Sequence, residues 1–271
     1  CRYSRPSGFP FNYRGHYNLS LFNLSIAPHN TTSTPTTTHR EGMSSGAPME
    51  FGEHRVETHA RETDLSVVYT IDPAVVDDYI NSVEQLLIGD KYKVVGIDLQ
   101  YTAGRPGIDQ KVAVAQLCVR HHVLIYHYCM ATEPCDRFNR FVNSTDYKFA
   151  TVETIDDVKA LSVTGLACKN LVEIREHYRV WGSTKKDSLV ELASAIIDPY
   201  YRDMKDSCNK DKCAWHSAWM EKLDKAHVVY AAKEAYTSYD MYRRIVDMRK
   251  CLVTQIDEPG SSHKQSKRHK K

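Results

Sequence analysis

The sequence predicts an α/β protein in which helices flank a mixed β-sheet of about five strands. Short apolar runs with strand-like composition stand between segments whose apolar residues recur every three or four positions, the spacing of a buried helical face. Two of these runs are separated only by Arg120 and His121, which predicts an antiparallel hairpin. Helices and strands then alternate before a helical remainder. This order is typical of a mixed sheet rather than of a regularly alternating parallel one.

The first predicted elements are a strand and an amphipathic helix. The strand is Leu65–Thr70 (LSVVYT). The helix lies in residues 72–91, because Asp72 stands in the N-cap position and Pro73 suits the first helical turn. Its buried face has helical spacing and consists of Val76, Tyr79, Ile80, Val83 and Leu87.

The same patterns predict the later elements. The helix at 187–196 can begin at Asp187 or at Ser188, since either side chain can serve as the N-cap. In chain order the elements are strands at 93–102, 111–119 and 122–129, a short helix at 136–143, a strand at 147–154, and helices at 155–161, 187–196 and about 225–248.

Composition divides the chain into three parts. Residues 1–62 include a Thr- and Ser-rich run without periodic apolar patterning, so they are expected to be disordered. Residues 63–252 hold the predicted elements and form the expected domain, and residues 253–271 form a basic tail. No apolar run approaches the roughly 18 residues that span a bilayer. The eight cysteines, without an export signal, are expected to be reduced thiols of an intracellular protein in the nucleus or the cytoplasm.

The formal charge is unevenly distributed. The whole chain carries +2, and its last nine residues, HKQSKRHKK, carry +5, which leaves −3 for everything else. The body is therefore not a broad basic platform that grips nucleic acid over a large area. The tail could be a nuclear-localisation signal, a nucleic-acid contact or a solubilising end. Its cations are Lys264, Lys267, Arg268, Lys270 and Lys271.

Three motifs carry the candidate chemistry. The strand KVVGIDLQYT ends with Asp98 and Gln100, whose side chains share one face because strand side chains alternate. A buried acid here most often holds a metal, and a second carboxylate would be the expected partner in place of the amide. KFATVETIDDVKAL places an acid one turn into a helix, with Asp156 favoured and Asp157 the alternative. YAAKEAY then provides Tyr230 and Glu234, one helical turn apart; they are the third motif.

In this order and at these separations, the motifs resemble those of the DEDDy 3′–5′ exonucleases. These proteins belong to the ribonuclease H-like superfamily, which includes RNase D and the Werner-syndrome exonuclease domain. The resemblance covers about residues 63–252 and is closest to a divergent plant group found in grasses. The segment SLVELASAII resembles the family's leucine-rich helix. The Trp and Leu residues that precede the last helix also resemble the family pattern. The resemblance implies a ribonuclease H-like fold and a role at the 3′ ends of DNA or RNA.

The resemblance also implies a metal centre. In active members two Mg²⁺ or Mn²⁺ ions clamp the scissile phosphate between four acids. Asp98 would bridge both ions, position 100 would hold one, and Asp156 and Glu234 would complete the set. Tyr230 would orient the attacking water.

The sequence departs from the family pattern at two of these positions. Gln100 is neutral where the family has Glu, and Glu234 is one methylene longer than the family's Asp. We therefore expect an exonuclease-family protein with impaired hydrolysis. The alternative is a non-catalytic module that keeps the fold to bind nucleic acid or protein. The sequence does not predict an oligomeric state.

Several residues have simpler explanations. Tyr230 suits aromatic packing as well as catalysis, because more tyrosines follow it in the same helix. The segment CNKDKCAWH is only loosely zinc-like, so a lysine-rich loop with incidental thiols is favoured. The histidines in or beside the predicted strand at 122–129 are expected to be ordinary surface or packing residues. The possible zinc ligands are Cys208, Cys213, His216 and His227, and the histidines in or beside the strand are His121, His122 and His127.

Overall fold

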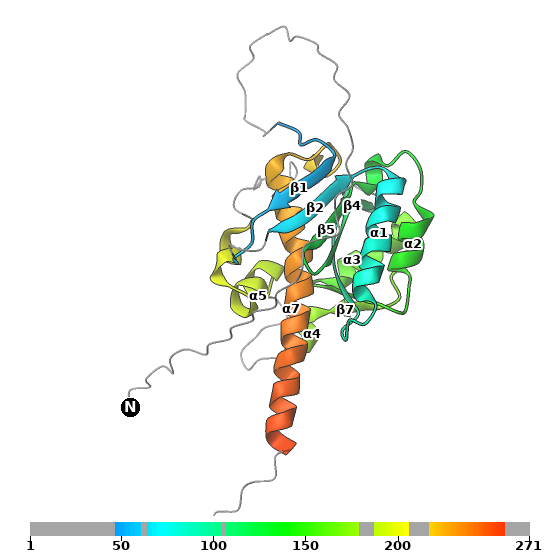
Figure 1. Ribbon diagram of the computed structural model, residues 1–271. Coiled ribbons are helices and arrows are strands. Elements are labelled where there is room, and N and C mark those ends of the chain that lie inside the picture. Colours follow the sequence, from blue (N-terminus) through cyan, green and yellow to red (C-terminus); the bar gives the residue numbers. More distant parts are fainter. Residues whose placement is uncertain (1–46, 61–63, 105–106, 179–186, 206–216, 258–271) are drawn as a thin grey trace, which may run out of the picture. The chain divides into compact units, whose positions relative to one another are not determined.

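Within the described residues, seven strands form one mixed sheet in the order β1-β2-β5-β4-β3-β6-β7 (Figure 1). The computed structural model describes residues 47–60, 64–104, 107–178, 187–205 and 217–257, with side chains up to residue 251. The expected mixed α/β class is confirmed. The strands are β1 (Gly52–Val56), β2 (Leu65–Thr70), β3 (Val94–Tyr101), β4 (Val112–Val119), β5 (His122–Tyr126), β6 (Lys148–Thr151) and β7 (Leu171–Glu173).

The pairing of the strands confirms the predicted hairpin and adds two edge strands. β4 and β5 are antiparallel with Val119 opposite His122, and β4 is also antiparallel to β3. β3 pairs with β6, and β2 with β5, in parallel. The sheet exceeds the expected strand number because β1 and β7 join its edges. Both are short and mostly exposed or half-buried, so they carry little apolar periodicity that a sequence pattern could reveal.

The helices begin where local capping chemistry places them. The Asp72 side chain accepts a hydrogen bond from the Ala74 N–H and caps α1, as predicted. Ser188 caps α5 through a capping box with Glu191, which decides between the two predicted starts. No helix in the described part of the chain is long and apolar enough to cross a membrane. The helices are α1 (Pro73–Leu87), α2 (Asp136–Val142), α3 (Thr154–Thr164), α4 (Ile174–His177), α5 (Leu189–Ile196) and α7 (Lys225–Asp257).

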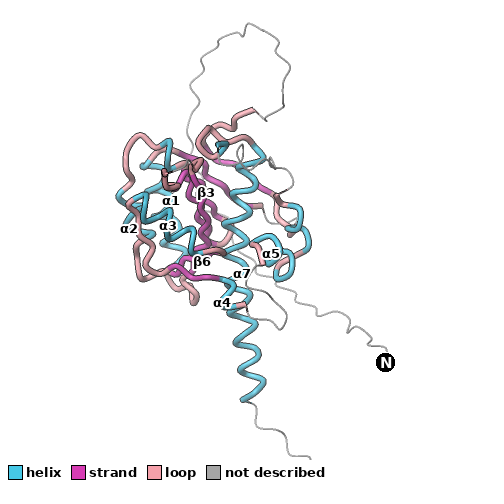
Figure 2. The backbone as a smooth tube through the Cα atoms, turned by 180° about the vertical axis from the view of Figure 1, so that it is seen from behind, coloured by secondary structure: helices cyan, strands magenta, loops and turns pink. Residues whose placement is uncertain are grey.

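Helices cover both faces of the sheet (Figures 1 and 2). α7 and α5 pack on one face, where their apolar residues form a cluster with Val94 and Val114. α1, α2 and α3 pack on the other face, together with Ile97 and Leu99 of β3. Because β3 side chains alternate, Asp98 and Gln100 face α7 instead. The predicted shared face of these two residues is therefore the interface between β3 and α7.

Gly96 allows the helix to approach the sheet closely. A Cβ atom at Gly96 would stand 2.2 Å from the carbonyl oxygen of Ala235 and 2.6 Å from the backbone nitrogen of Tyr239. Only a residue without a side chain fits such an approach. The glycine therefore brings α7 near enough for its polar side chains to reach those of β3.

Ordered structure begins earlier than the sequence predicts. β1 and residues 47–51 lie within the segment 1–62 that we expect to be disordered, whereas residues 1–46 lie outside the described residues. The Met49 N–H donates to the Leu223 carbonyl at 2.7 Å, and the Phe51 ring lies 4.7 Å from that of Tyr69. β1 is ordered because it pairs with the edge of the sheet, and its polar local sequence gives no indication of this. At the other end, α7 continues past residue 252, where we expected the domain to end.

A buried chain of hydrogen bonds holds the segment that leads into α7. The Leu223 N–H donates to the Tyr69 hydroxyl at 2.9 Å, and that hydroxyl lies 2.9 Å from His127 Nδ1. His127 Nε2 lies 3.0 Å from the Trp219 carbonyl. The backbone carbonyl can only accept, so Nε2 carries the proton and Nδ1 accepts from Tyr69. His127 is thus a packing histidine, as expected, with a defined neutral tautomer.

This arrangement predicts a loss of stability in acid. Burial lowers the pKa of His127 to about 4 from an ordinary 6.5. Between these values the unfolded chain binds the proton and the folded chain does not, so stability falls as the pH drops through that interval. The full effect is about 3 kcal/mol. Urea unfolding of the wild type and His127→Gln at several pH values measures it. The difference between their free energies of unfolding should shrink below pH 6.5; a constant difference would contradict a neutral buried histidine.

Candidate functional site

Three buried polar side chains meet between β3 and α7, which lie beside each other in Figure 2. The Gln100 amide nitrogen donates to Asp98 Oδ2 at 3.0 Å and to Glu234 Oε2 at 2.7 Å. Asp98, Gln100 and Glu234 are 9%, 8% and 6% exposed. We call these three residues the acid–amide cluster. The structure brings them together as the sequence predicts, although Glu234 comes from a distant part of the chain.

Tyr230 belongs to the same site. It lies one turn before Glu234 in α7, is 3% exposed, and forms a side-chain hydrogen bond with Glu234. Its ring centroid also lies 6.4 Å from that of Trp219. Tyr230 therefore both packs in the core and contacts the cluster, so the two interpretations of this residue are compatible.

Burial raises the pKa values of both carboxyl groups of the cluster. Burial raises the pKa of Asp98 well above its ordinary value, and the charge of Glu234 adds to this rise. Burial also raises the pKa of Glu234, whereas hydrogen bonds from Tyr230 and Asp98 and the charge of Lys205 act in the opposite direction. Both carboxyl groups therefore favour the protonated form more than exposed acids do. The amide hydrogens of Gln100 face both of them.

The third acid near the cluster is Asp157, which corrects our preference for Asp156. Asp157 is 4% exposed, whereas the side chain of Asp156 is exposed to solvent. The charge of Asp157 raises the pKa of Asp98. Its carboxylate accepts hydrogen bonds from the Tyr101 hydroxyl at 2.5 Å and the Thr151 hydroxyl at 3.0 Å.

The start of α3 explains the correction. Glu153 precedes the helix with a φ of 73°, in the left-handed region, and this turn sets the rotation of the first helical residues. One residue corresponds to about 100° of rotation around a helix axis, so a different start exchanges the buried and exposed acids. No local sequence signal fixes that start, because the N-cap makes no side-chain hydrogen bond.

Burial raises the pKa of Asp157 to about 7, although the hydroxyl groups of Tyr101 and Thr151 stabilise its ionised form. Both oxygens of this carboxylate already have donors from the sheet. Asp157 is therefore tied to β3 and β6 and not hydrogen-bonded to the acid–amide cluster.

Sequence reasoning missed four residues around the site. Tyr101 and Thr151 hold Asp157, and Lys205 lies within electrostatic reach of Glu234. Gln116 is fully buried directly opposite Asp98 in the β3–β4 pair, and its amide has no hydrogen-bond partner among the described residues. Only the polar residue within the apolar run VAVAQLCV could have indicated Gln116. The other three emerge only from tertiary contacts.

The residues present do not fit two divalent ions. Such ions prefer carboxylate oxygens, and here the Gln100 amide directs its hydrogens at both carboxyl groups of the cluster. Hydrogen-bearing nitrogen cannot serve as a metal ligand. No group of three or more His, Cys, Asp and Glu side chains suited to a metal occurs in the described ranges. The amide occupies the position between two carboxylates that a cation takes in a metal centre.

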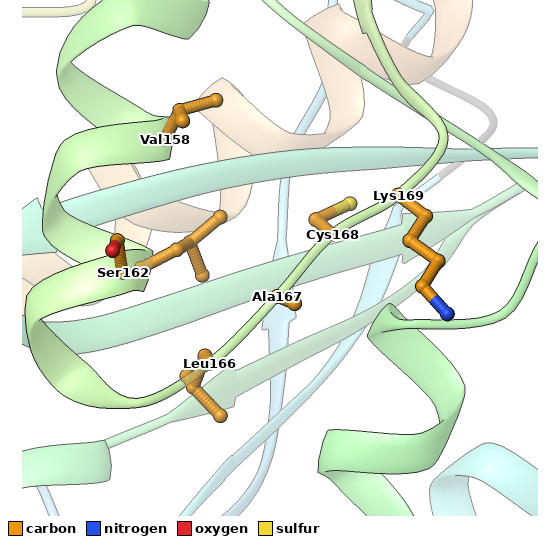
Figure 3. A pocket seen from close by; sticks show the side chains of 7 residues that line it. Val158, Ser162, Leu166, Ala167, Cys168 and Lys169 are labelled. Carbon is orange, nitrogen blue, oxygen red and sulfur yellow. The ribbon is translucent and has the colours of Figure 1, made fainter.

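A cavity of about 250 Å³ lies between α3 and the segment that follows it (Figure 3). Burial raises the pKa of its Cys168 thiol to about 12, so the thiol remains protonated and is a poor nucleophile. The cavity does not include any residue of the acid–amide cluster. Its lining is Val158, Leu161, Ser162, Leu166, Ala167, Cys168 and Lys169.

No protein-family model and no curated protein matches the chain. Solved structures do match it. RNase D from Trypanosoma brucei, solved as a complex with GMP, is 11% identical with a TM-score of 0.52, over 70% of this chain and 63% of that chain. The fold is that of RNase D.

Two further structures are similar to this chain. The catalytic core of RRP6 from Trypanosoma brucei is 14% identical with a TM-score of 0.50, over 69% of this chain and 48% of that one. NrnC from Brucella melitensis with bound Mg²⁺ is 13% identical with a TM-score of 0.45, over 61% and 80%. This chain thus spans less than two thirds of the RNase D and RRP6 chains. The expected ribonuclease H-like fold is confirmed, and the plant group stays a prediction.

Several predicted residues lie outside the described ranges. They are the tail cations Lys264, Lys267, Arg268, Lys270 and Lys271, and the zinc-like candidates Cys208, Cys213 and His216. The remaining zinc candidate, His227, has its Nδ1 atom 2.8 Å from Asp224 Oδ1. The N-terminus of α7 thus already accounts for that histidine.

Proposed function

We propose that this chain is a member of the DEDDy 3′–5′ exonuclease family that binds nucleic-acid 3′ ends and in which two-metal hydrolysis is impaired. The main support for this proposal is that Asp98, Gln100 and Glu234 come from two distant motifs and meet at one buried interface. Tyr230 stands one turn from Glu234, as the family motif requires. The RNase D fold supports the same assignment.

Impairment follows from the contacts of the Gln100 amide. To admit a divalent ion, the cluster would have to ionise two buried carboxyl groups whose pKa values burial raises, and break both amide hydrogen bonds. Two buried hydrogen bonds to charged or acidic groups contribute roughly 1.5–3 kcal/mol each. The ion would then bind a neutral amide oxygen in place of a carboxylate, and this weaker interaction would offset less of the lost free energy.

The same contacts favour binding without turnover. Because burial raises the pKa values of Asp98 and Glu234, the cluster carries less negative charge than fully ionised acids would and repels a phosphate less. Lys205 is exposed and lies within electrostatic reach of Glu234, so its ammonium group can meet the terminal phosphate of a strand.

A degradation assay tests this proposal. The wild type, with a 5′-labelled single strand or recessed duplex in Mn²⁺, should produce little laddering. Restoring the family residues in the double variant Gln100→Glu/Glu234→Asp should raise the rate by about tenfold or more, the scale of metal-site changes.

Asp98→Ala in the restored background is the control and should abolish the gain. Robust laddering by the wild type that disappears in Asp98→Ala would overturn impairment. If neither protein binds the strands, the nucleic-acid assignment itself is wrong. The alternative, a protein-binding module on this fold, would then remain.

A further inference from the structure

A concentration of cations lies at the end of the sheet where β3 and β6 begin. We call it the basic face. The Lys148 N–H donates to the Lys93 carbonyl at 2.8 Å, which places these two residues side by side. The acid–amide cluster lies toward the opposite end of β3. The basic face consists of Lys91, Lys93, Lys148, Arg243, Arg249 and Lys250.

The basic face opposes the charge of the rest of the protein. The described side chains between residues 47 and 251 include 20 Lys and Arg and 28 Asp and Glu, a formal net charge of 20 − 28 = −8. The six cations have four acids among them, Asp90, Glu176, Asp240 and Asp247, a net charge of 6 − 4 = +2. This is a local positive region on a negative body.

Aromatic rings hold several of these cations in place. The Arg243 guanidinium lies 5.4 Å from the ring centroids of both Tyr92 and Tyr239. The ammonium groups of Lys91 and Lys250 lie 4.5 Å and 5.2 Å from the Tyr92 ring. Because Tyr92 and Tyr239 are 7% and 2% exposed, they orient cations and cannot stack on bases. Cations positioned in this way suit phosphate groups.

Histidines beside the basic face respond to its potential. Burial lowers the pKa of His177, and the nearby Arg249 and Lys148 lower it further, against the charge of Glu176. Burial likewise lowers the pKa of His121, with Arg243 and Arg120 among the contributing cations and Asp240 opposing them. Both shifts agree with a positive potential at this end of the molecule.

We propose that the basic face binds the phosphate backbone of a nucleic-acid strand whose 3′ end lies at the acid–amide cluster. This rests on the proposed function. α7 connects the two sites, since Glu234 and Lys250 are 16 residues apart in one helix, about 24 Å at 1.5 Å per residue. Backbone contacts fix position without reading sequence, so the expected ligand is a single strand of any sequence.

The test is the salt dependence of binding to a fluorescent single-stranded oligonucleotide, measured by anisotropy. The variant Lys93→Gln/Lys148→Gln/Lys250→Gln removes three cations of the basic face. Each phosphate contact contributes about 0.7 to the slope of log K against log salt for single strands, so the slope should fall by roughly 2. Affinity at low salt should fall as well.

The matched control is Arg140→Gln/Lys169→Gln/Arg202→Gln, which removes three exposed cations elsewhere and gives the same net charge. It should keep the wild-type slope. Equal slopes for both triple variants would show that the basic face does not bind the strand, and would leave the proposed function intact. Absence of binding by the wild type would overturn both. Tighter binding to vesicles containing phosphatidylserine than to the oligonucleotide would assign the face to membranes and overturn this proposal.

Discussion

Gln100→Glu is expected to destabilise the metal-free protein by about 3 kcal/mol, because it adds a buried charge that lacks a partner. The amide hydrogens of Gln100 now link Asp98 and Glu234 at 3.0 Å and 2.7 Å. A carboxylate at position 100 removes both hydrogen bonds and adds repulsion. In a domain of this size the melting temperature should fall by roughly 10 °C in the presence of a chelator.

The same variant should gain a dependence on divalent ions. Mn²⁺ at about 100 times its dissociation constant would return roughly 2.7 kcal/mol, whereas the wild type should show little shift. Gln85→Glu, an exposed position in α1, is the matched control for the added charge and should change neither value. A wild type that melts much higher with Mn²⁺ would show that the amide does not exclude the ion.

Gly96→Ala should destabilise the protein by about 3 kcal/mol, at the upper end for overpacking. The new methyl group would stand 2.2 Å from the Ala235 carbonyl oxygen, and backbone atoms cannot rotate away. β3 and α7 would have to separate, which also lengthens the contacts of Glu234 with the cluster. Chemical denaturation measures the effect.

Gly104→Ala is the matched control. The nearest atom to its added Cβ is Gln110 Cγ at 3.4 Å, part of a flexible side chain, so the change should cost under about 1 kcal/mol. Equal losses in the two variants would show that the close approach at Gly96 does not determine the spacing of the helix and the sheet.

Local sequence patterns were sufficient to predict most of the helices and strands. The Asp72 cap and the apolar spacing after it indicate α1, and the two residues between β4 and β5 indicate their hairpin. Strand alternation alone places Asp98 and Gln100 on one face. These features depend on neighbours within a few residues, which is why they are legible without coordinates. The spacing of Tyr230 and Glu234 likewise requires only that their segment be helical.

Tertiary structure decided the features that depend on distant partners. Asp157 replaces Asp156 because a left-handed turn at Glu153 sets the rotation of α3. The Gln100 amide bridges two carboxyl groups only because Gly96 admits α7, and β1 is ordered only because β2 offers its edge. The basic face likewise gathers cations from separate segments. By itself the sequence determined most of the elements and the types of residue at the site. Packing decided the edge strands and the orientation of the site residues, because helix rotation, amide direction and burial are set by contacts across the chain.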